Sequence, residues 1–185
     1  MNITRSVMFV VALASPMVPL LASQNDIAAV QHSSHATEAR SAFIEKVRKA
    51  TELFRDVRNA SPAGYDPVLG CVSGPQEGAM GVHFLKGSLV MDGVLDAEQP
   101  EALIYEFKGG VARLVGVEYI VLASVWHQTH AEQDPPVLEG QLLQFYDSPN
   151  RFGLPPFYEL HVWAWRDNPH GAFVDWNPRV SCEGH

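Results

Sequence analysis

The chain is poor in cysteine, in charged residues and in basic clusters. Of its 185 residues, two are cysteines and 18% are charged. Acidic residues outnumber basic ones by 21 to 13, which gives a net charge of −8. A domain of this composition, without a basic patch, is not expected to bind nucleic acid or an anionic membrane surface.

Several catalytic motifs are also absent from the sequence. It contains no GxSxG, the motif of serine nucleophiles, and no glycine-rich phosphate loop with its lysine. No HxH or HExxH spacing joins two histidines. A serine nucleophile and a phosphate loop are therefore not predicted, and a metal site would have to gather its ligands from separate parts of the chain.

The only long apolar run lies at the N-terminus. In residues 1–23 a basic residue, Arg5, precedes an apolar stretch that ends in small residues, which is the order of a secretory signal peptide. Pro16 and Pro19 interrupt the run and weaken it as a membrane-spanning helix. An uncleaved N-terminal anchor is the alternative. The sequence thus predicts an exported protein, periplasmic or extracellular, without stable membrane insertion after cleavage.

The cysteines are Cys71 and Cys182. In an exported protein an even number of cysteines indicates a disulfide. Two free thiols, or two metal ligands far apart in the sequence, are the alternatives. The predicted bridge closes a loop of roughly 110 residues and ties the start of the β-rich region to the end of the chain.

The rest of the pattern predicts a single α+β domain over residues 36–185. A flexible lead-in is expected over 24–35, and an amphipathic helix over 36–59, because apolar residues recur there on one stripe. Short runs rich in β-branched and aromatic residues, separated by Gly and Pro, indicate strands at 80–86, 102–108, 112–123, 140–147 and 157–166. We therefore expect one N-terminal helix packed on an antiparallel, curved or barrel-like sheet.

One hairpin can be predicted in register. The Gly-Gly pair at 109–110 suits a two-residue turn of the primed type, and this turn places Glu106 opposite Arg113. Strict alternation then puts Glu118 on the other face, with Tyr105 and further apolar residues. A carboxylate in such surroundings needs a partner, because an isolated buried charge is very costly.

Three predicted strands each carry one polar residue of ligand type among apolar neighbours: His83, Glu118 and His161. Two histidines and a carboxylate form the ligand set of non-haem iron and of several zinc or manganese sites. Neutral imidazoles supply two nitrogen ligands, and the carboxylate offsets the charge of the metal while positions stay open. We therefore expect a divalent transition metal, which could be iron, zinc, manganese or copper, to be the cofactor if the three side chains converge.

Aromatic and polar residues around these strands are predicted to line a pocket. The strand residues would form its wall, and the turn-dense segment 166–182 would form its rim, where polar groups beside an aromatic ring suit a small polar ligand. The alternative is that this C-terminal segment has only a structural role and is fixed to the domain by Cys182. The expected pocket residues are Phe84, Tyr105, Trp163, Trp165, His170, Asp175 and Trp176.

Four stretches resemble a family of small exported bacterial proteins: GCVSGPQEGAMGVHF (70–84), ALIYE (102–106), LVGVEYIV (114–121) and ELHVWAWRDNPHGAFVDWNPRVSC (159–182). The resemblance covers about residues 61–182 and implies that this range is one unit. The family has no established activity, so the resemblance implies no catalytic residue.

The sequence therefore predicts an exported domain whose partner is a metal ion or a small molecule. A metal-dependent enzyme, in which an open coordination position activates water, oxygen or a substrate oxygen, is the more specific hypothesis. A metal-free acid/base couple between Glu118 and a histidine is one alternative. A non-enzymatic binding protein with a buried His–Glu pair is another, and a structural or envelope protein whose tryptophans are only core is a third.

Overall fold

The computed structural model of the chain describes residues 24–184, and the predicted signal peptide lies outside the described residues. Contacts divide the chain into Met1–His35 and Ala36–His185, and the second unit contains the sheet. The helices are α1 (Gln24–Thr51), α2 (Gly87–Val90) and α3 (Ala123–Trp126), with 3-10 turns η1 (Glu52–Arg55), η2 (Val57–Asn59) and η3 (Ser61–Ala63). None of the helices in the described range is long and apolar enough to cross a membrane.

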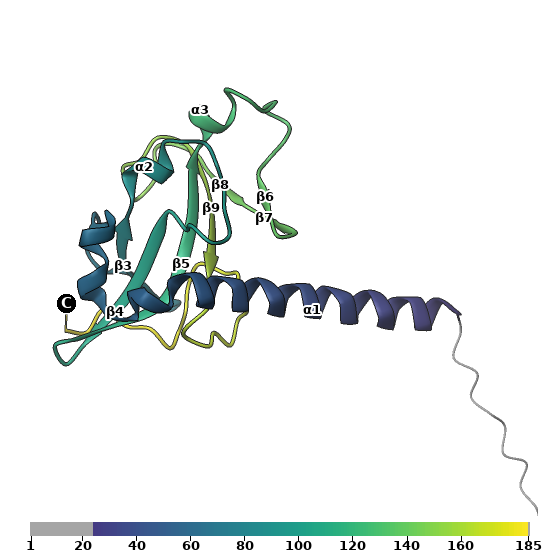
Figure 1. The fold of residues 1–185 in the computed structure, drawn as a ribbon, viewed down its shortest axis with the longest axis horizontal. Helices are drawn as coiled ribbons and strands as arrows, with labels where there is room; N and C mark the ends of the chain where they lie inside the picture. The colour runs from purple at the N-terminus through teal and green to yellow at the C-terminus, as the bar shows by residue number, and fades with distance from the viewer. Residues whose placement is uncertain (1–23, 185) are drawn as a thin grey trace, which may run out of the picture. The chain divides into compact units, whose positions relative to one another are not determined.

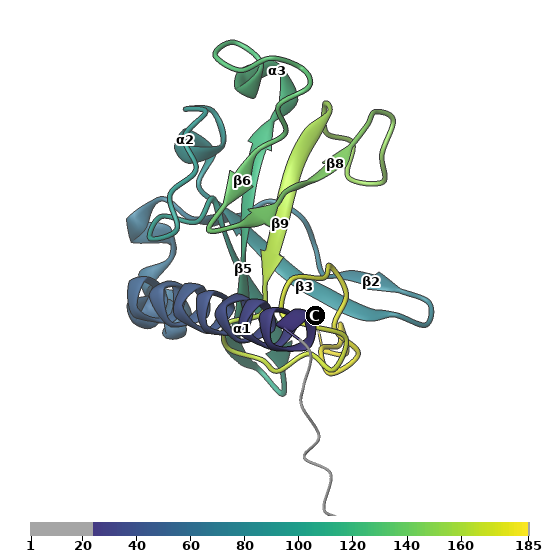
Figure 2. The same ribbon diagram turned by 90° about the vertical axis from the view of Figure 1, so that its right-hand side faces the viewer.

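The fold is α+β, as predicted, with an antiparallel seven-stranded sheet in the order β1-β3-β4-β5-β9-β8 and β2 paired with β3 (Figure 1). The longer strands are β3 (Gly78–Leu85), β4 (Ala102–Lys108), β5 (Val111–Leu122) and β9 (Phe157–Val162). The shorter ones are β1 (Asp66–Pro67), β2 (Val72–Gly74) and β8 (Gln144–Tyr146), and β6 (Val137–Leu138) pairs with β7 (Gln141–Leu142) apart from the sheet. Figure 2 shows β2 turning back into β3 as a hairpin.

The predicted hairpin between β4 and β5 is confirmed. Both glycines of the turn have positive φ, and Glu106 is paired with Arg113 in the ladder. The carboxylate of Glu106 nevertheless forms its ion pair with Arg166, and it accepts the backbone N–H of Ser181 at 3.2 Å. Glu106 therefore ties the C-terminal segment to β4.

One face of the sheet, here called the core face, packs against the end of α1. Phe43 and Val47 of the helix are buried there, and Phe43 lies 5.8 Å from the Tyr119 ring. The core face consists of residues that the ladders place opposite one another and that share one apolar cluster: Val82, Phe84, Leu103, Tyr105, Val117, Tyr119, Leu160 and Val162. The predicted packing of an N-terminal helix on a sheet is thus confirmed.

The helix boundaries differ from the prediction. The backbone is helical from Gln24, whereas we expected the helix to begin at residue 36. The segment 24–35 contains no Gly or Pro, the residues that most strongly oppose a helix. At its other end α1 stops at Thr51 rather than near residue 59, and the chain continues in 3-10 turns. The side chains of Phe54 and Val57 still pack against the core, so the apolar stripe indicated burial correctly but not the helix type.

Of the two predicted forms of the sheet, curved or barrel-like, the barrel-like one is not found, because the sheet does not close into a barrel. Its edge strands β1 and β8 have two and three residues. Such short strands leave too few backbone groups to pair across a closing seam. The sheet therefore has two distinct faces, and the face away from α1 is free to carry polar groups.

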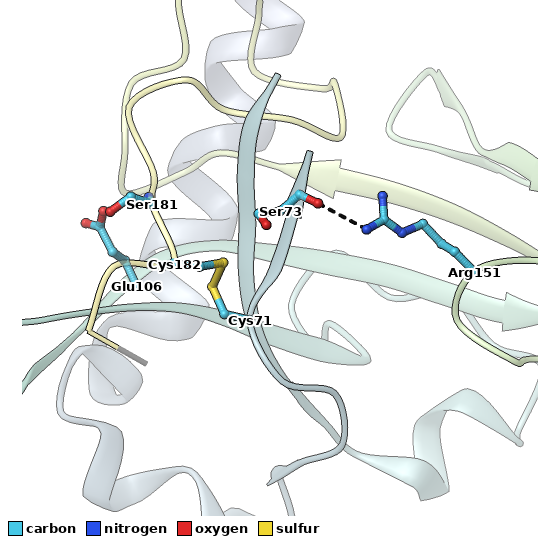
Figure 3. The surroundings of a disulfide bond; sticks show 6 residues. All are labelled: Cys71, Ser73, Glu106, Arg151, Ser181 and Cys182. Atoms are coloured by element: carbon cyan, nitrogen blue, oxygen red, sulfur yellow. Dashed lines mark hydrogen bonds between the residues drawn. A yellow bond between two sulfur atoms is a disulfide. The ribbon is translucent and has the colours of Figure 1, made fainter. Parts of the chain in front are cut away.

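The C-terminal segment crosses that second face and is held by the disulfide. Cys71 and Cys182 are bonded, with their Cα atoms 5.5 Å apart (Figure 3). Asn177 exchanges backbone hydrogen bonds with Ala79 at 3.1 and 3.2 Å, and Arg151 donates to the carbonyl of Ser73 beside the bridge (Figure 3). The predicted disulfide is confirmed, and it joins the β2–β3 hairpin to the chain end.

Glu101, just before β4, is a buried carboxyl group that lowers stability at neutral pH. One oxygen accepts the Ile120 N–H at 3.1 Å, and no cation pairs with Glu101 among the described side chains. Burial raises its pKa to about 8. In the unfolded chain the Glu101 carboxyl group loses its proton above about pH 4.5, its ordinary pKa, while in the folded chain it keeps this proton up to about pH 8. Stability is therefore lost as pH rises from about 4.5 to about 8. Glu101→Gln is therefore expected to raise the free energy of unfolding by about 3 kcal/mol at pH 7 and by little at pH 4.

Denaturant unfolding at the two pH values measures this effect. The control is Glu98→Gln, because Glu98 is exposed in the same loop and its replacement should change stability little at either pH. An equal effect of Glu101→Gln at pH 4 and pH 7 would contradict the titration argument.

Candidate metal centre

The three predicted ligands lie together on the face of the sheet opposite the core face, here called the site face. His83 is in β3, Glu118 is in β5 and His161 is in β9. Glu118 is paired directly with His161 in the ladder and with Ala102 on its other side. Since Ala102 has only a methyl side chain, the side chains of His83 and Glu118 can meet above β4.

The ligand atoms of this triad are close to one another. The Nε2 atoms of His83 and His161 are 3.4 Å apart, with the rings nearly perpendicular at 89°. An oxygen of Glu118 lies 3.6 Å from Nε2 of His83. One atom from each residue lies within 4.8 Å of the others, so the three could hold a metal ion.

Both histidines are neutral in the folded protein. Each is buried, with at most 3% of its surface exposed, and burial lowers the pKa of both His83 and His161 to about 4. Glu118 partly opposes this shift at His83, as does Asp175 at His161. A neutral imidazole has a free lone pair, which is the form that a metal ion binds.

A second group of acidic residues touches the triad. Nδ1 of His161 lies 3.8 Å from Glu159 and 3.9 Å from Asp175. Asp175 accepts a hydrogen bond of 2.5 Å from the hydroxyl of Tyr146. Burial, and then the neighbouring carboxylate of Glu118, raise the pKa of Glu159 well above its usual range.

Several polar atoms of this cluster are unpartnered. Within the part of the chain that the structure describes, Nδ1 of His83, Nδ1 of His161 and one oxygen of Glu159 are buried without a hydrogen bond. Leaving such atoms unpaired costs roughly 1–3 kcal/mol each. Native proteins rarely retain several such atoms in one place unless they serve a ligand or a reaction.

An apolar cavity opens onto the centre. Its lining includes His83, Glu118, Glu159 and His161, and its volume is about 30 Å³, which is room for roughly two water molecules. The remaining lining is apolar and comes from the loops beside β1 and β9 and from the site face: Val68, Leu69, Met80, Leu85, Ile120, Phe152, Leu154 and Phe157.

The expected pocket residues do not share this cavity. Phe84 and Tyr105 are on the core face, where their rings pack 4.9 Å apart, and so they lie across the sheet from the histidines. Trp165 donates to Thr51 of α1 and lines a separate surface hollow. The prediction that these aromatic side chains would enclose the histidines is therefore corrected.

The residues of the expected rim are also divided. Trp163 is buried beside the centre, with its ring 6.1 Å from that of His161. Asp175 reaches the centre through His161, as described above. His170 and Trp176 instead line a shallow hollow with Glu77.

A β-bulge explains why alternation misplaced Glu118 relative to Tyr105. Tyr105 is paired with Leu114, whereas Ile104 is paired with Gly116, so one extra residue of β5 has no partner. Beyond that point the faces of β5 are exchanged, and Glu118 moves from the core face to the site face. Gly116 was the sequence signal for this bulge, since a glycine within a strand often marks one. A Cβ atom there would lie 2.8 Å from the carbonyl oxygen of Val162.

Sequence reasoning missed Glu159 and Tyr146. Glu159 precedes His161 by two residues on one strand, so alternation alone places both on the same face. Tyr146 could not be found in this way, because its approach depends on the pairing of β8 with β9.

Fold and site together define an α+β protein with a buried histidine–carboxylate centre on an open antiparallel sheet. No protein-family model, no curated protein and no solved structure matches the chain. Its function must therefore be argued from the centre itself.

Proposed function

We propose that this protein is an exported domain that binds a divalent transition metal ion through Nε2 of His83, Nε2 of His161 and the carboxylate of Glu118. The observation that carries the proposal is the 3.4 Å separation of the two Nε2 atoms. Two nitrogens bound to one tetrahedral zinc at about 2.0–2.1 Å are about 3.3–3.4 Å apart. The carboxylate oxygen at 3.6 Å from His83 fits the same sphere.

The protonation states support metal binding better than a direct hydrogen bond. If one Nε2 carried a proton and donated it to the other, the donor ring would have a bare Nδ1 lone pair. At His83 this atom has no hydrogen-bond partner among the described residues, and at His161 it lies 3.8 Å from Glu159 and 3.9 Å from Asp175, beyond the length of a hydrogen bond. With a metal on both Nε2 atoms, each Nδ1 carries the proton instead, and that of His161 points toward Glu159 and Asp175. Such a carboxylate partner orients and strengthens a histidine ligand.

Three protein ligands leave a coordination position open, as in catalytic rather than structural zinc sites. The cavity of about 30 Å³ is lined by all three ligands, by Glu159 and by apolar side chains. Its size suits water or another ligand of few atoms. A bound metal lowers the pKa of its water toward neutrality, which supports a metal-dependent enzyme that activates water or a small oxygen ligand. The disulfide supports export, because such bonds persist in oxidising compartments.

A metal-free protein with a buried histidine pair is the second candidate, since 3.4 Å also permits an N–H···N contact. The discriminating experiment is a titration of the metal-free protein with cobalt(II), whose visible spectrum reports tetrahedral coordination. We expect one strongly absorbing cobalt(II) per His83–Glu118–His161 site. Glu118→Gln should weaken its affinity at least about 100-fold, more than loss of a residue outside the ligand set.

The matched control for this titration is His130→Ala. His130 is exposed on the loop after α3 and stacks on Trp126. Its removal should leave cobalt binding unchanged. An octahedral spectrum that is lost in His130→Ala, and retained in Glu118→Gln, would refute the proposed site.

A further inference from the structure

The acidic side of His161 has the features of a second ion site. Glu159, His161 and Asp175 form a second group whose ligand atoms lie within 4.8 Å of one another. Acidic side chains alone do not make a site, but here two atoms aimed into the group are buried and unpartnered. They are the Oε1 atom of Glu159 and the Nδ1 atom of His161, on side chains that are 2% and 1% exposed.

The two groups approach His161 from opposite ring nitrogens. The triad uses Nε2, which faces His83 at 3.4 Å, and the acidic group uses Nδ1, which faces Glu159 and Asp175 at 3.8 and 3.9 Å. An imidazole can bind two metal ions in this way once both of its nitrogens have lost their protons. We propose that the ring of His161 bridges two divalent ions, with the second ion held by Nδ1 of His161 and the carboxylates of Glu159 and Asp175.

The charges of the centre are compatible with two ions. Glu118, Glu159 and Asp175 are three carboxyl groups, and no Lys or Arg in the described part of the chain forms an ion pair with them. With one divalent ion bound, Glu118 and Asp175 balance its charge and Glu159 keeps its proton, which a second divalent ion displaces. Binding of the second ion releases the Nδ1 proton of His161 to solvent. Two divalent ions are then balanced by three carboxylates and one imidazolate.

The hydroxyl of Tyr146 holds the second group in place. It donates to one oxygen of Asp175 at 2.5 Å, while the other oxygen of Asp175 is the one that faces His161. The second ligand of the group, Glu159, is fixed on β9 two residues from His161. The acidic group is therefore positioned by a paired strand and by a hydrogen bond.

This inference rests on the proposed function, and metal stoichiometry separates the two. The protein, purified without a His tag, is loaded with zinc, dialysed and analysed for zinc per chain. We expect two zinc ions in the wild type and one in both Asp175→Asn and Glu159→Gln. Both variants keep the size of the side chain, and Asn at 175 can still accept the hydrogen bond of Tyr146. Asp167→Asn is the control, because Asp167 is an exposed acidic residue of the same segment, and it should keep two ions.

Copper(II) gives a second readout that a merely structural role would not change. Two copper(II) ions on one imidazolate couple antiferromagnetically, so the wild type should show much less paramagnetic resonance intensity than two isolated ions. Asp175→Asn should show the full intensity of one. One zinc per wild-type chain, unchanged by Asp175→Asn, would overturn the bridge and leave the proposed function standing. No zinc in the wild type would refute both, and two zinc ions in both acidic variants would place the second ion elsewhere.

Discussion

Replacement of Cys71 and Cys182 by alanine is expected to lower the free energy of unfolding by about 4–5 kcal/mol. The bridge spans 111 residues, and in the chain-entropy model a closed loop of about that length is among the most stabilising, because it removes many conformations from the unfolded state. This loss is about half the total stability of a typical domain. Equilibrium unfolding in denaturant, with the wild type and the double alanine variant compared under the same conditions, measures it.

Reduction of the wild-type bridge provides the control for side-chain volume, since it leaves both sulfur atoms in place. The reduced wild type and the double variant should lose similar stability. A loss below about 1 kcal/mol in both would contradict the expectation. It would mean that the bridge restricts the unfolded chain much less than the chain-entropy model assumes, for example because residual structure already limits that chain.

The buried histidines are expected to reduce stability in acid. For a histidine whose folded pKa is lowered to about 4, as at His83, the unfolded chain takes up a proton as pH falls below about 6.5, while the folded chain does not. Stability is therefore lost from pH 6.5 down to about pH 4, and it then becomes constant. The expected loss is about 3 kcal/mol for His83 alone.

This contribution has to be measured as a difference, because Glu101 and Glu159 have raised pKa values and act in the opposite direction. We expect the free energy of unfolding of the wild type minus that of His83→Gln to fall by about 3 kcal/mol between pH 7 and pH 4. Both proteins are measured in the presence of a metal chelator. The same difference taken with His130→Gln, at an exposed histidine, should stay nearly constant. A difference for His83→Gln that does not vary with pH would show that His83 is protonated in the fold or is reached by solvent.

Local sequence rules predicted the parts of the fold that depend on local chemistry. The Gly-Gly turn determined the β4–β5 register, and β4 was predicted at its observed bounds, Ala102–Lys108. The rules failed where long-range pairing decides the outcome. The bulge opposite Ile104 exchanged the faces of β5, and the short edge strands left the sheet open.

The candidate centre was partly predictable, because local chemistry also identifies polar residues on apolar strands. A lone polar residue on an otherwise apolar strand is costly unless it has a partner, and this argument found His83, Glu118 and His161. It could not assign the aromatic residues to a face, because Phe84 and Tyr105 lie on the core face while Trp163 lies on the site face. The acidic side of the centre needed the tertiary structure, since Tyr146 and Asp175 meet only after β8 and the C-terminal segment reach β9.

The most direct test of the metal centre is elemental analysis of the protein purified without a His tag, side by side with His161→Ala. The analysis covers iron, zinc, copper and manganese, both as purified and after loading with each metal. His161 is the residue that both proposed ion positions share, so a stoichiometric metal should be present in the wild type and lost in the variant. Absence of metal from the wild type after loading, or an equal content in His161→Ala, would contradict the account and leave His83 and His161 as a buried, hydrogen-bonded pair.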